Sequence, residues 1–139
     1  MGQGIRLTEI VQKMALKKLT PGVELVDKEV NVPDVNRPAL QLAGFFDHFD
    51  SNRVQIIGNV EYRYVNTLTQ ERQEYIYKKL LEHSIPCIVF CRDMEPGEKF
   101  LGLAAERGVP VFKTSKQTSD FTAEIIRWMN VRLAPSISI

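Results

Sequence analysis

The sequence predicts an α/β domain, a three-layer sandwich built on a mostly parallel, Rossmann-like sheet. Three apolar runs, at 53–58, 86–91 and 109–112, are each followed by a segment with helical patterning or capping signals. The run at 86–91 is almost continuously apolar, which is typical of a parallel strand covered on both faces. Strand–helix units in succession favour right-handed crossovers and therefore a parallel sheet with helices packed on it.

The first half is predicted to be less regular. Apolar residues at helical spacing indicate a first helix: Leu7, Ile10, Val11 and Met14. Thr8 is its expected cap, the turn residues at 19–22 its expected end, and Lys13, Lys17 and Lys18 its solvated basic face. Short extended pieces are expected at 23–26 and 29–32. The segment 31–38 holds two prolines and is expected to be a loop, and a short helix at 39–43 should stop near Gly44.

The second half has clearer signals. Thr67 and Gln70 fit a capping box that starts a helix running to about His83, with Ile76, Leu80 and Leu81 facing inward. Pro96 suits the first turn of the next helix, and Gly108 suits its exit. That helix should bury Phe100, Leu101, Ala104 and Ala105. Thr118 or Ser119 is expected to cap a last helix, which should bury Phe121, Ile125, Trp128 and Met129. The first half is expected to add a strand or two at one edge of the sheet.

Length and composition indicate one ordinary globular domain. The chain has 139 residues, of which 44% are hydrophobic and 25% charged, and its formal net charge is +1. Because nucleic-acid binders carry a strongly basic face, this balance argues against a nucleic-acid partner. No run approaches the roughly 18 apolar residues that span a bilayer, and the start lacks a signal-peptide hydrophobic region. We therefore expect no membrane association and a cytoplasmic location.

Cys87 and Cys91 both lie in the apolar run at 86–91. Four residues of strand span about 13 Å, whereas a disulfide needs Cα atoms within about 7 Å. The two cysteines are therefore expected to be buried structural thiols, which agrees with a reducing compartment.

No residue set for catalysis, cofactor binding or metal binding emerges from the sequence. It contains neither the P-loop pattern G-x-x-x-x-G-K-[ST] nor the dinucleotide pattern G-x-G-x-x-G. His83 is expected at a helix end in a capping or surface role, and His48 in partly buried aromatic packing, with a ligand contact as its alternative. The acidic pairs Asp47 with Asp50 and Glu95 with Glu98 are interpreted as capping residues rather than a catalytic pair.

One polar constellation points to a ligand. Ligands of open parallel sheets bind at the carboxyl ends of the strands. The residues expected there are Asn36, Arg37, Arg92, Lys113 and Ser115. Their cations and hydroxyl suit a small anion held near helix amino termini. Ordinary polar loop chemistry is the alternative, since polar strand ends are common.

Three blocks of sequence resemble the amino-terminal domain of the bacterial HPr kinase/phosphorylase family: DVNRPALQLAGFF at 34–46, RVQIIGNVE at 53–61 and RLAP at 132–135. The resemblance spans about Leu7 to Pro135. It implies residues 1–135 as that domain, with a fold like the substrate-binding domain of muramyl peptide ligases. Residues 136–139 would begin a linker or the first strand of a catalytic domain.

The resemblance also implies a function for the full-length parent. Such an enzyme, a cytoplasmic hexameric transferase, phosphorylates a serine of the phosphocarrier HPr with ATP or pyrophosphate and Mg²⁺. It reverses the reaction by phosphorolysis, in carbon catabolite repression through the sugar phosphotransferase system. Its P-loop, catalytic acid and HPr-binding residues lie in the carboxy-terminal domain, so this chain itself is expected to be a non-catalytic regulatory or assembly domain. A stand-alone domain binding a small anionic or phosphorylated ligand, a purely structural oligomerisation module and a stand-alone Rossmann-like enzyme are the alternatives.

Overall fold

The computed structural model describes residues 4–134. The strands are β1 (Ile5–Arg6), β2 (Lys17–Lys18), β3 (Glu29–Val30), β4 (Val35–Asn36), β5 (Val54–Ile57), β6 (Ile88–Phe90) and β7 (Val111–Lys113). The helices are α1 (Leu7–Lys13), α2 (Ala39–Leu42), α3 (Asn59–Asn66), α4 (Gln70–Leu81), α5 (Glu98–Glu106) and α6 (Thr118–Leu133). The tail at 136–139, expected to begin a linker or strand, lies outside the described residues, and the domain limits stay a prediction.

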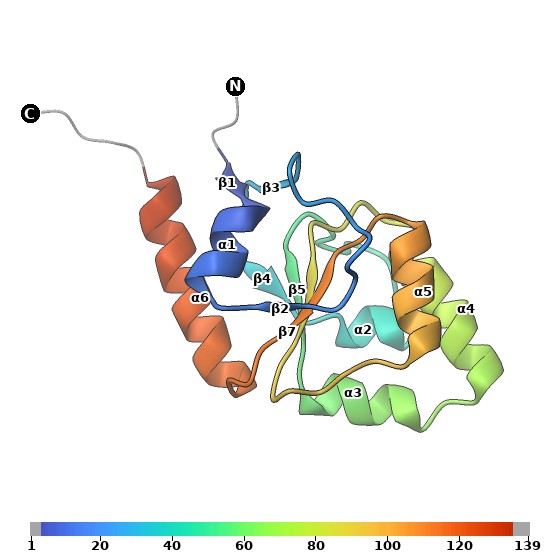
Figure 1. The fold of residues 1–139 in the computed structure, drawn as a ribbon. Coiled ribbons are helices and arrows are strands. Elements are labelled where there is room, and N and C mark those ends of the chain that lie inside the picture. The colour runs from blue at the N-terminus through green and yellow to red at the C-terminus, as the bar shows by residue number, and fades with distance from the viewer. Residues whose placement is uncertain (1–3, 135–139) are drawn as a thin grey trace, which may run out of the picture.

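A five-stranded sheet in the order β2–β7–β6–β5–β4 runs through the middle of the molecule (Figure 1). Strands β4 to β7 are parallel, with Gln55 opposite Ile88 and Ile88 opposite Val111, while β2 pairs antiparallel with β7. The expected mostly parallel sheet is therefore confirmed. The first half adds one strand at each edge, β2 and β4, rather than a strand or two at one edge. It also forms a separate antiparallel ribbon from β1 and β3.

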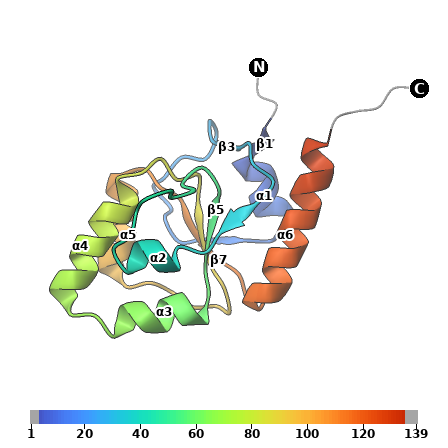
Figure 2. The same ribbon diagram turned by 180° about the vertical axis from the view of Figure 1, so that it is seen from behind.

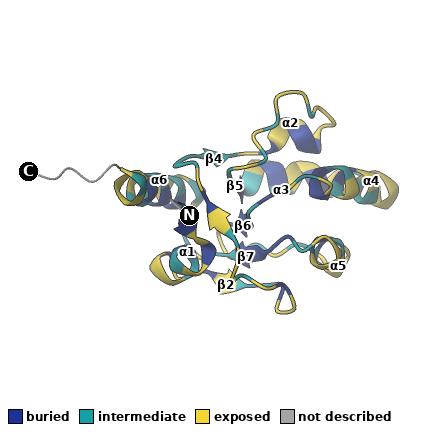
Figure 3. Cartoon of the chain, turned by 90° about the horizontal axis from the view of Figure 1, so that it is seen from above, coloured by how far each residue is buried: buried dark blue, intermediate teal, exposed yellow. Residues whose placement is uncertain are grey.

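Helices cover both faces of this sheet and make three layers (Figures 2 and 3). Helices α1 and α6 lie on one face, and α2 to α5 lie on the other. Strand β6 and its flanks serve both cores by alternation: Cys87, Val89 and Cys91 face α1 and α6, whereas Ile88 and Phe90 face α4 and α5. Both cysteines are buried free thiols, as expected. No helix within residues 4–134 is long and apolar enough to cross a bilayer.

The first helix is shorter than the sequence indicated. It ends at Lys13, and Ala15 takes a left-handed backbone conformation with φ 52° that turns the chain. Lys17 and Lys18 therefore form β2 instead of a helical face. The expected cap Thr8 lies inside α1, whose preceding residue Arg6 provides no side-chain cap.

Besides β1 and β2, two further elements were not predicted, and one predicted piece is missing. The proline-containing segment 31–38 holds β4, and the residues after β5 form α3. The piece at 23–26 contains turns and no strand. The short helix near Gly44 is confirmed as α2, and Gly44 has φ 107°.

The helix limits of the second half differ in detail. The cap of α4 is Thr69, whose hydroxyl accepts the Arg72 N–H, while the Thr67 hydroxyl donates to Tyr64 O at the end of α3. Gln117 precedes α6 in place of Thr118 or Ser119. The inward residues predicted for α4 and α6 are buried or partly buried, but Ala105 of α5 is exposed.

The buried Cys87 makes stability depend on pH. Burial raises the pKa of its thiol from 9.0 to about 12, so the folded state holds this proton more tightly than the unfolded chain does. The stabilisation that the protonated Cys87 thiol gives the folded state is therefore fully present below pH 9.0. It is lost as the pH rises towards 12. We expect the wild type to lose up to about 1.4 kcal/mol of unfolding free energy per pH unit more than Cys87→Ala in this window.

Urea denaturation of both proteins across this alkaline range measures the difference. Cys91, the tyrosines and the lysines are present in both proteins, so their titration cancels in the comparison. Parallel losses of stability would contradict the expectation.

Candidate functional site

The carboxyl edge of the parallel strands gathers the five residues predicted to bind a ligand. Asn36 ends β4, Arg37 follows it, Arg92 follows β6, Lys113 ends β7 and Ser115 lies in the next turn. Because β4 to β7 are parallel, all five lie at the same edge of the sheet. They differ, however, in what their side chains already contact.

Asn36 is committed to an internal hydrogen-bond network. Its side-chain amide donates to Gln55 Oε1 at 2.7 Å and to Gln41 Oε1 at 3.4 Å. The fully buried Gln55 in turn donates to Asp50 O at 3.0 Å and to Arg53 O at 2.9 Å. These bonds link the short edge strand β4 to β5 and engage the half-buried Asn36 amide within the domain, so a ligand would have to compete with them.

Arg37 is paired with a buried carboxylate that sequence reasoning missed. Its Nη2 and Nε donate to Glu61 Oε1 at 2.7 and 3.2 Å, and Glu61 is only 4% exposed. The same oxygen accepts the Gly58 N–H at 2.7 Å, which caps the amino end of α3. The sequence did contain a signal for Glu61: it lies three residues after Gly58, the position of a capping carboxylate in the first turn of a helix. Helix α3, however, was not predicted.

Gly58 is required by its neighbours. A Cβ at this position would lie 2.6 Å from Arg37 Nη2 and 2.7 Å from the Thr118 hydroxyl. Cys91 lies in the same region: burial raises the pKa of its thiol, and the Thr118 hydroxyl and the Arg37 guanidinium oppose that effect. The ends of β5 and β6 and the amino ends of α3 and α6 therefore meet around Gly58.

Lys113 is also paired. Its amino group donates to the Glu95 carboxylate, and this bond lowers the pKa of Glu95 and raises that of Lys113. Glu95 therefore neutralises a predicted ligand cation instead of acting as a helix cap. Glu98 lies in the first turn of α5, where a capping role was expected.

Arg92 and Ser115 are exposed at this edge. Arg92 and Asp93 both have positive φ, 60° and 56°, in a tight turn closed by the Met94 N–H on Cys91 O at 3.1 Å. Such φ values are uncommon for residues other than glycine. Arg92 enters no ion pair within the described part of the chain.

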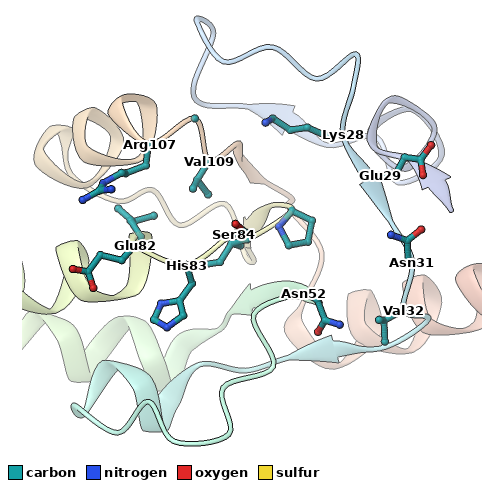
Figure 4. A pocket seen from close by; sticks show the side chains of 14 residues that line it. Lys28, Glu29, Asn31, Val32, Asn52, Glu82, His83, Ser84, Arg107 and Val109 are labelled. Atoms are coloured by element: carbon teal, nitrogen blue, oxygen red, sulfur yellow. The ribbon is translucent and has the colours of Figure 1, made fainter. Parts of the chain in front are cut away.

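A groove lies at the opposite edge of the sheet, where the sequence predicted no ligand site. This groove of about 420 Å³ is formed before β5, β6 and β7 and beside β3 (Figure 4). Its lining side chains include Lys28, Asn52, Ser84 and Arg107. These residues follow helices or irregular segments. The rule that ligands bind at the carboxyl ends of parallel strands therefore did not select them.

His83 also lines this groove and occupies a helix end, as expected. Its Nδ1 lies 3.2 Å from Lys79 O, and its ring stacks on Phe46 with centroids 5.4 Å apart. His48, in contrast, is exposed with φ 60°, so the expectation of partly buried packing was wrong. Among residues 4–134 no three His, Cys, Asp or Glu side chains gather to hold a metal ion.

The Glu61 pairing predicts a stability effect. Glu61→Gln removes the charge that binds Arg37 while retaining an acceptor for the Gly58 N–H. Since hydrogen bonds to charged groups contribute about 1.5–3 kcal/mol, and the Arg37 side chain is 39% exposed and therefore screened, we expect a loss of about 1–2 kcal/mol. Urea denaturation measures it against Glu106→Gln, an exposed control at the end of α5 that should change stability by less than about 0.5 kcal/mol. Equal effects of the two substitutions would refute the role assigned to Glu61.

Comparison with known proteins agrees with this fold. The family model described as HPr Serine kinase N terminus matches residues 5–129. The HPr kinase/phosphorylase of Lachnoclostridium phytofermentans is 53% identical over 135 residues, which cover 97% of this chain and 44% of that protein. The protein of the same name from Caldicellulosiruptor bescii is 35% identical over 130 residues, covering 94% of this chain and 42% of the relative.

A solved structure shares the fold at low sequence identity. It contains the CBS and DRTGG domains of the regulatory region of Clostridium perfringens pyrophosphatase, complexed with the activator diadenosine tetraphosphate. The TM-score is 0.64 and the identity 14%, with 96% of this chain and 51% of that chain covered. The likeness to muramyl peptide ligases stays a prediction. From the match over residues 5–129 and the relatives above, this chain belongs to the HPr Serine kinase N terminus family.

Proposed function

We propose that the chain is the non-catalytic amino-terminal domain of a cytoplasmic, hexameric HPr kinase/phosphorylase. The carrying observation is that the family match covers residues 5–129, while the chain spans only 44% of the length of its Lachnoclostridium relative. The whole enzyme phosphorylates a serine of HPr with ATP or pyrophosphate and Mg²⁺ and removes the phosphate by phosphorolysis. Its output is the control of carbohydrate use in carbon catabolite repression.

The residues of the chain support the non-catalytic assignment. Phosphoryl transfer requires a phosphate cradle, a lysine for the β- and γ-phosphates and ligands for the metal. The sequence contains no P-loop pattern. The chemistry therefore belongs to a part of the enzyme that this chain does not supply.

The carboxyl edge supports a regulatory role through a small anionic or phosphorylated ligand. The proposed ligand residues are Asn36, Arg37, Arg92, Lys113 and Ser115. Arg37 and Lys113 are held by Glu61 and Glu95, so a ligand must exchange with these carboxylates. Exposed Arg92 offers the first contact. That the solved structure of similar fold is part of a regulatory region is an analogy in favour of this role.

A chimera tests the domain assignment. This chain replaces the matching segment of the Lachnoclostridium enzyme, with which it is 53% identical. We expect the chimera to phosphorylate HPr with ATP and Mg²⁺ at a rate within about tenfold of the parent, because the matched segment supplies no catalytic group. The 139-residue chain alone should transfer no phosphate. Transfer by the chain alone, or an inactive chimera that folds and assembles like the parent, would refute the assignment.

A thermal-shift screen tests the ligand. The probes are inorganic phosphate, pyrophosphate and fructose 1,6-bisphosphate at millimolar concentration. A ligand present at 100 times its Kd stabilises the folded state by about 2.7 kcal/mol and raises Tm by several degrees. We expect a rise for at least one probe that is lost in Arg92→Ser and kept in Arg107→Ser, which changes an exposed arginine at the opposite edge. No rise with any probe, or a rise that survives Arg92→Ser, would count against this site.

A further inference from the structure

Helix α2 turns an apolar face to the surface. Leu40 and Phe45 are each 66% exposed, whereas the polar Gln41 is buried at 6%. Ala39 in the helix and Ala43 just after it are also exposed, and Phe45 lies three residues beyond the helix end. Leu42 of the same helix is buried at 3%, so α2 buries one apolar and one polar side chain and leaves a second apolar face exposed, where a surface helix normally has polar residues.

The apolar face continues onto α4 as one surface. The Arg72 guanidinium lies close to Gly44, where an added Cβ would be 3.1 Å from Arg72 Nη2. The same guanidinium lies over the Tyr75 ring, 5.1 Å from its centroid. The Lys79 amino group lies 5.9 Å from the same ring. Tyr75 is 50% exposed. We call the surface made by Leu40, Phe45, Arg72, Tyr75 and Lys79 the α2–α4 patch.

The charges at this patch are balanced. Arg72 and Lys79 enter no ion pair within residues 4–134, and the same holds for Asp47 and Glu71, the exposed carboxylates that adjoin the patch in sequence. Nucleic acid or an anionic membrane would require an excess of positive charge, which two cations and two carboxylates do not give. An apolar centre with both signs of charge at its rim is instead complementary to a copy of itself.

We propose that the α2–α4 patch is a self-association surface that binds the same patch of a second copy of this chain. In such a two-fold contact Leu40 and Phe45 meet their counterparts at the centre, and the cations of one copy face the carboxylates of the other. The chain carries a net charge of only +1, so two copies do not repel each other strongly. The inference identifies one interface for the proposed assembly and holds for the chain alone, whatever the activity of the whole enzyme.

Sedimentation velocity of the 139-residue chain between about 1 and 100 μM tests the contact. We expect a monomer–dimer equilibrium that Phe45→Glu shifts to monomer throughout this range. Val131→Glu is the matched control, since Val131 is 72% exposed on α6 on the other face of the sheet, and it should dimerise like the wild type. Circular dichroism melting establishes that each variant is folded.

Charge reversal separates this contact from general hydrophobic association. One variant carries Arg72→Glu with Lys79→Glu and presents an acidic patch, and another carries Asp47→Lys with Glu71→Lys and presents a basic one. Each variant should be monomeric alone, and an equimolar mixture should form a heterodimer.

A wild type that stays monomeric at 100 μM overturns the proposal, as does dimerisation that survives Phe45→Glu, or a mixture that remains monomeric. The measurement uses neither HPr nor nucleotide, so its failure is distinct from failure of the chimera.

Discussion

The Glu61 carboxylate is the constraint on which the carboxyl edge depends. Buried and charged, it must be paired, because an unpaired ion at such a position costs several kcal/mol. Its partners are Arg37, which leads from β4 into α2, and the Gly58 N–H, where β5 turns into α3. Because Gly58 has no side chain, Thr118 at the start of α6 packs directly against it. One carboxylate thus fixes the junction of β4, α2, β5 and α3, and α6 packs against that junction.

This constraint shapes what the edge can do. An edge lined by unpaired cations would bind any anion, whereas here Glu61 occupies Arg37 and Glu95 occupies Lys113. A ligand must therefore offer more than one negative charge to displace internal carboxylates that are already held in place. Phosphorylated compounds with several acidic oxygens meet this requirement better than a simple monoanion. Any ligand selectivity of the proposed site would follow from this competition within the domain.

The sequence predicted the parts whose signals are local. The run at 86–91 is apolar throughout because β6 is covered on both faces, and its strand was found. Helix α3 was missed because Val60 and Tyr64 are exposed and its start depends on Gly58 and Glu61. Strand β4 has only two residues, and the side-chain bond from Asn36 to Gln55 supplements its backbone pairing with β5. Topology predicted that the five proposed ligand residues share one edge of the sheet. It could not predict the pairing of Arg37 and Lys113, which depends on distant parts of the chain.

The exposed apolar residues at helix α2 contribute little to the stability of the folded single chain. Its inward face is filled by Gln41, which contributes to the network at β4 and β5, and by Leu42, which packs in the hydrophobic core. Leu40 and Phe45 then gain nothing from burial in this chain, although each would contribute about 1.5–3 kcal/mol if covered. Consistency within the fold would place polar residues there. We attribute their apolar character to the proposed contact with a second copy of the chain. Since Arg37 lies two residues before α2, its ion pair with Glu61 anchors the start of the helix at the carboxyl edge.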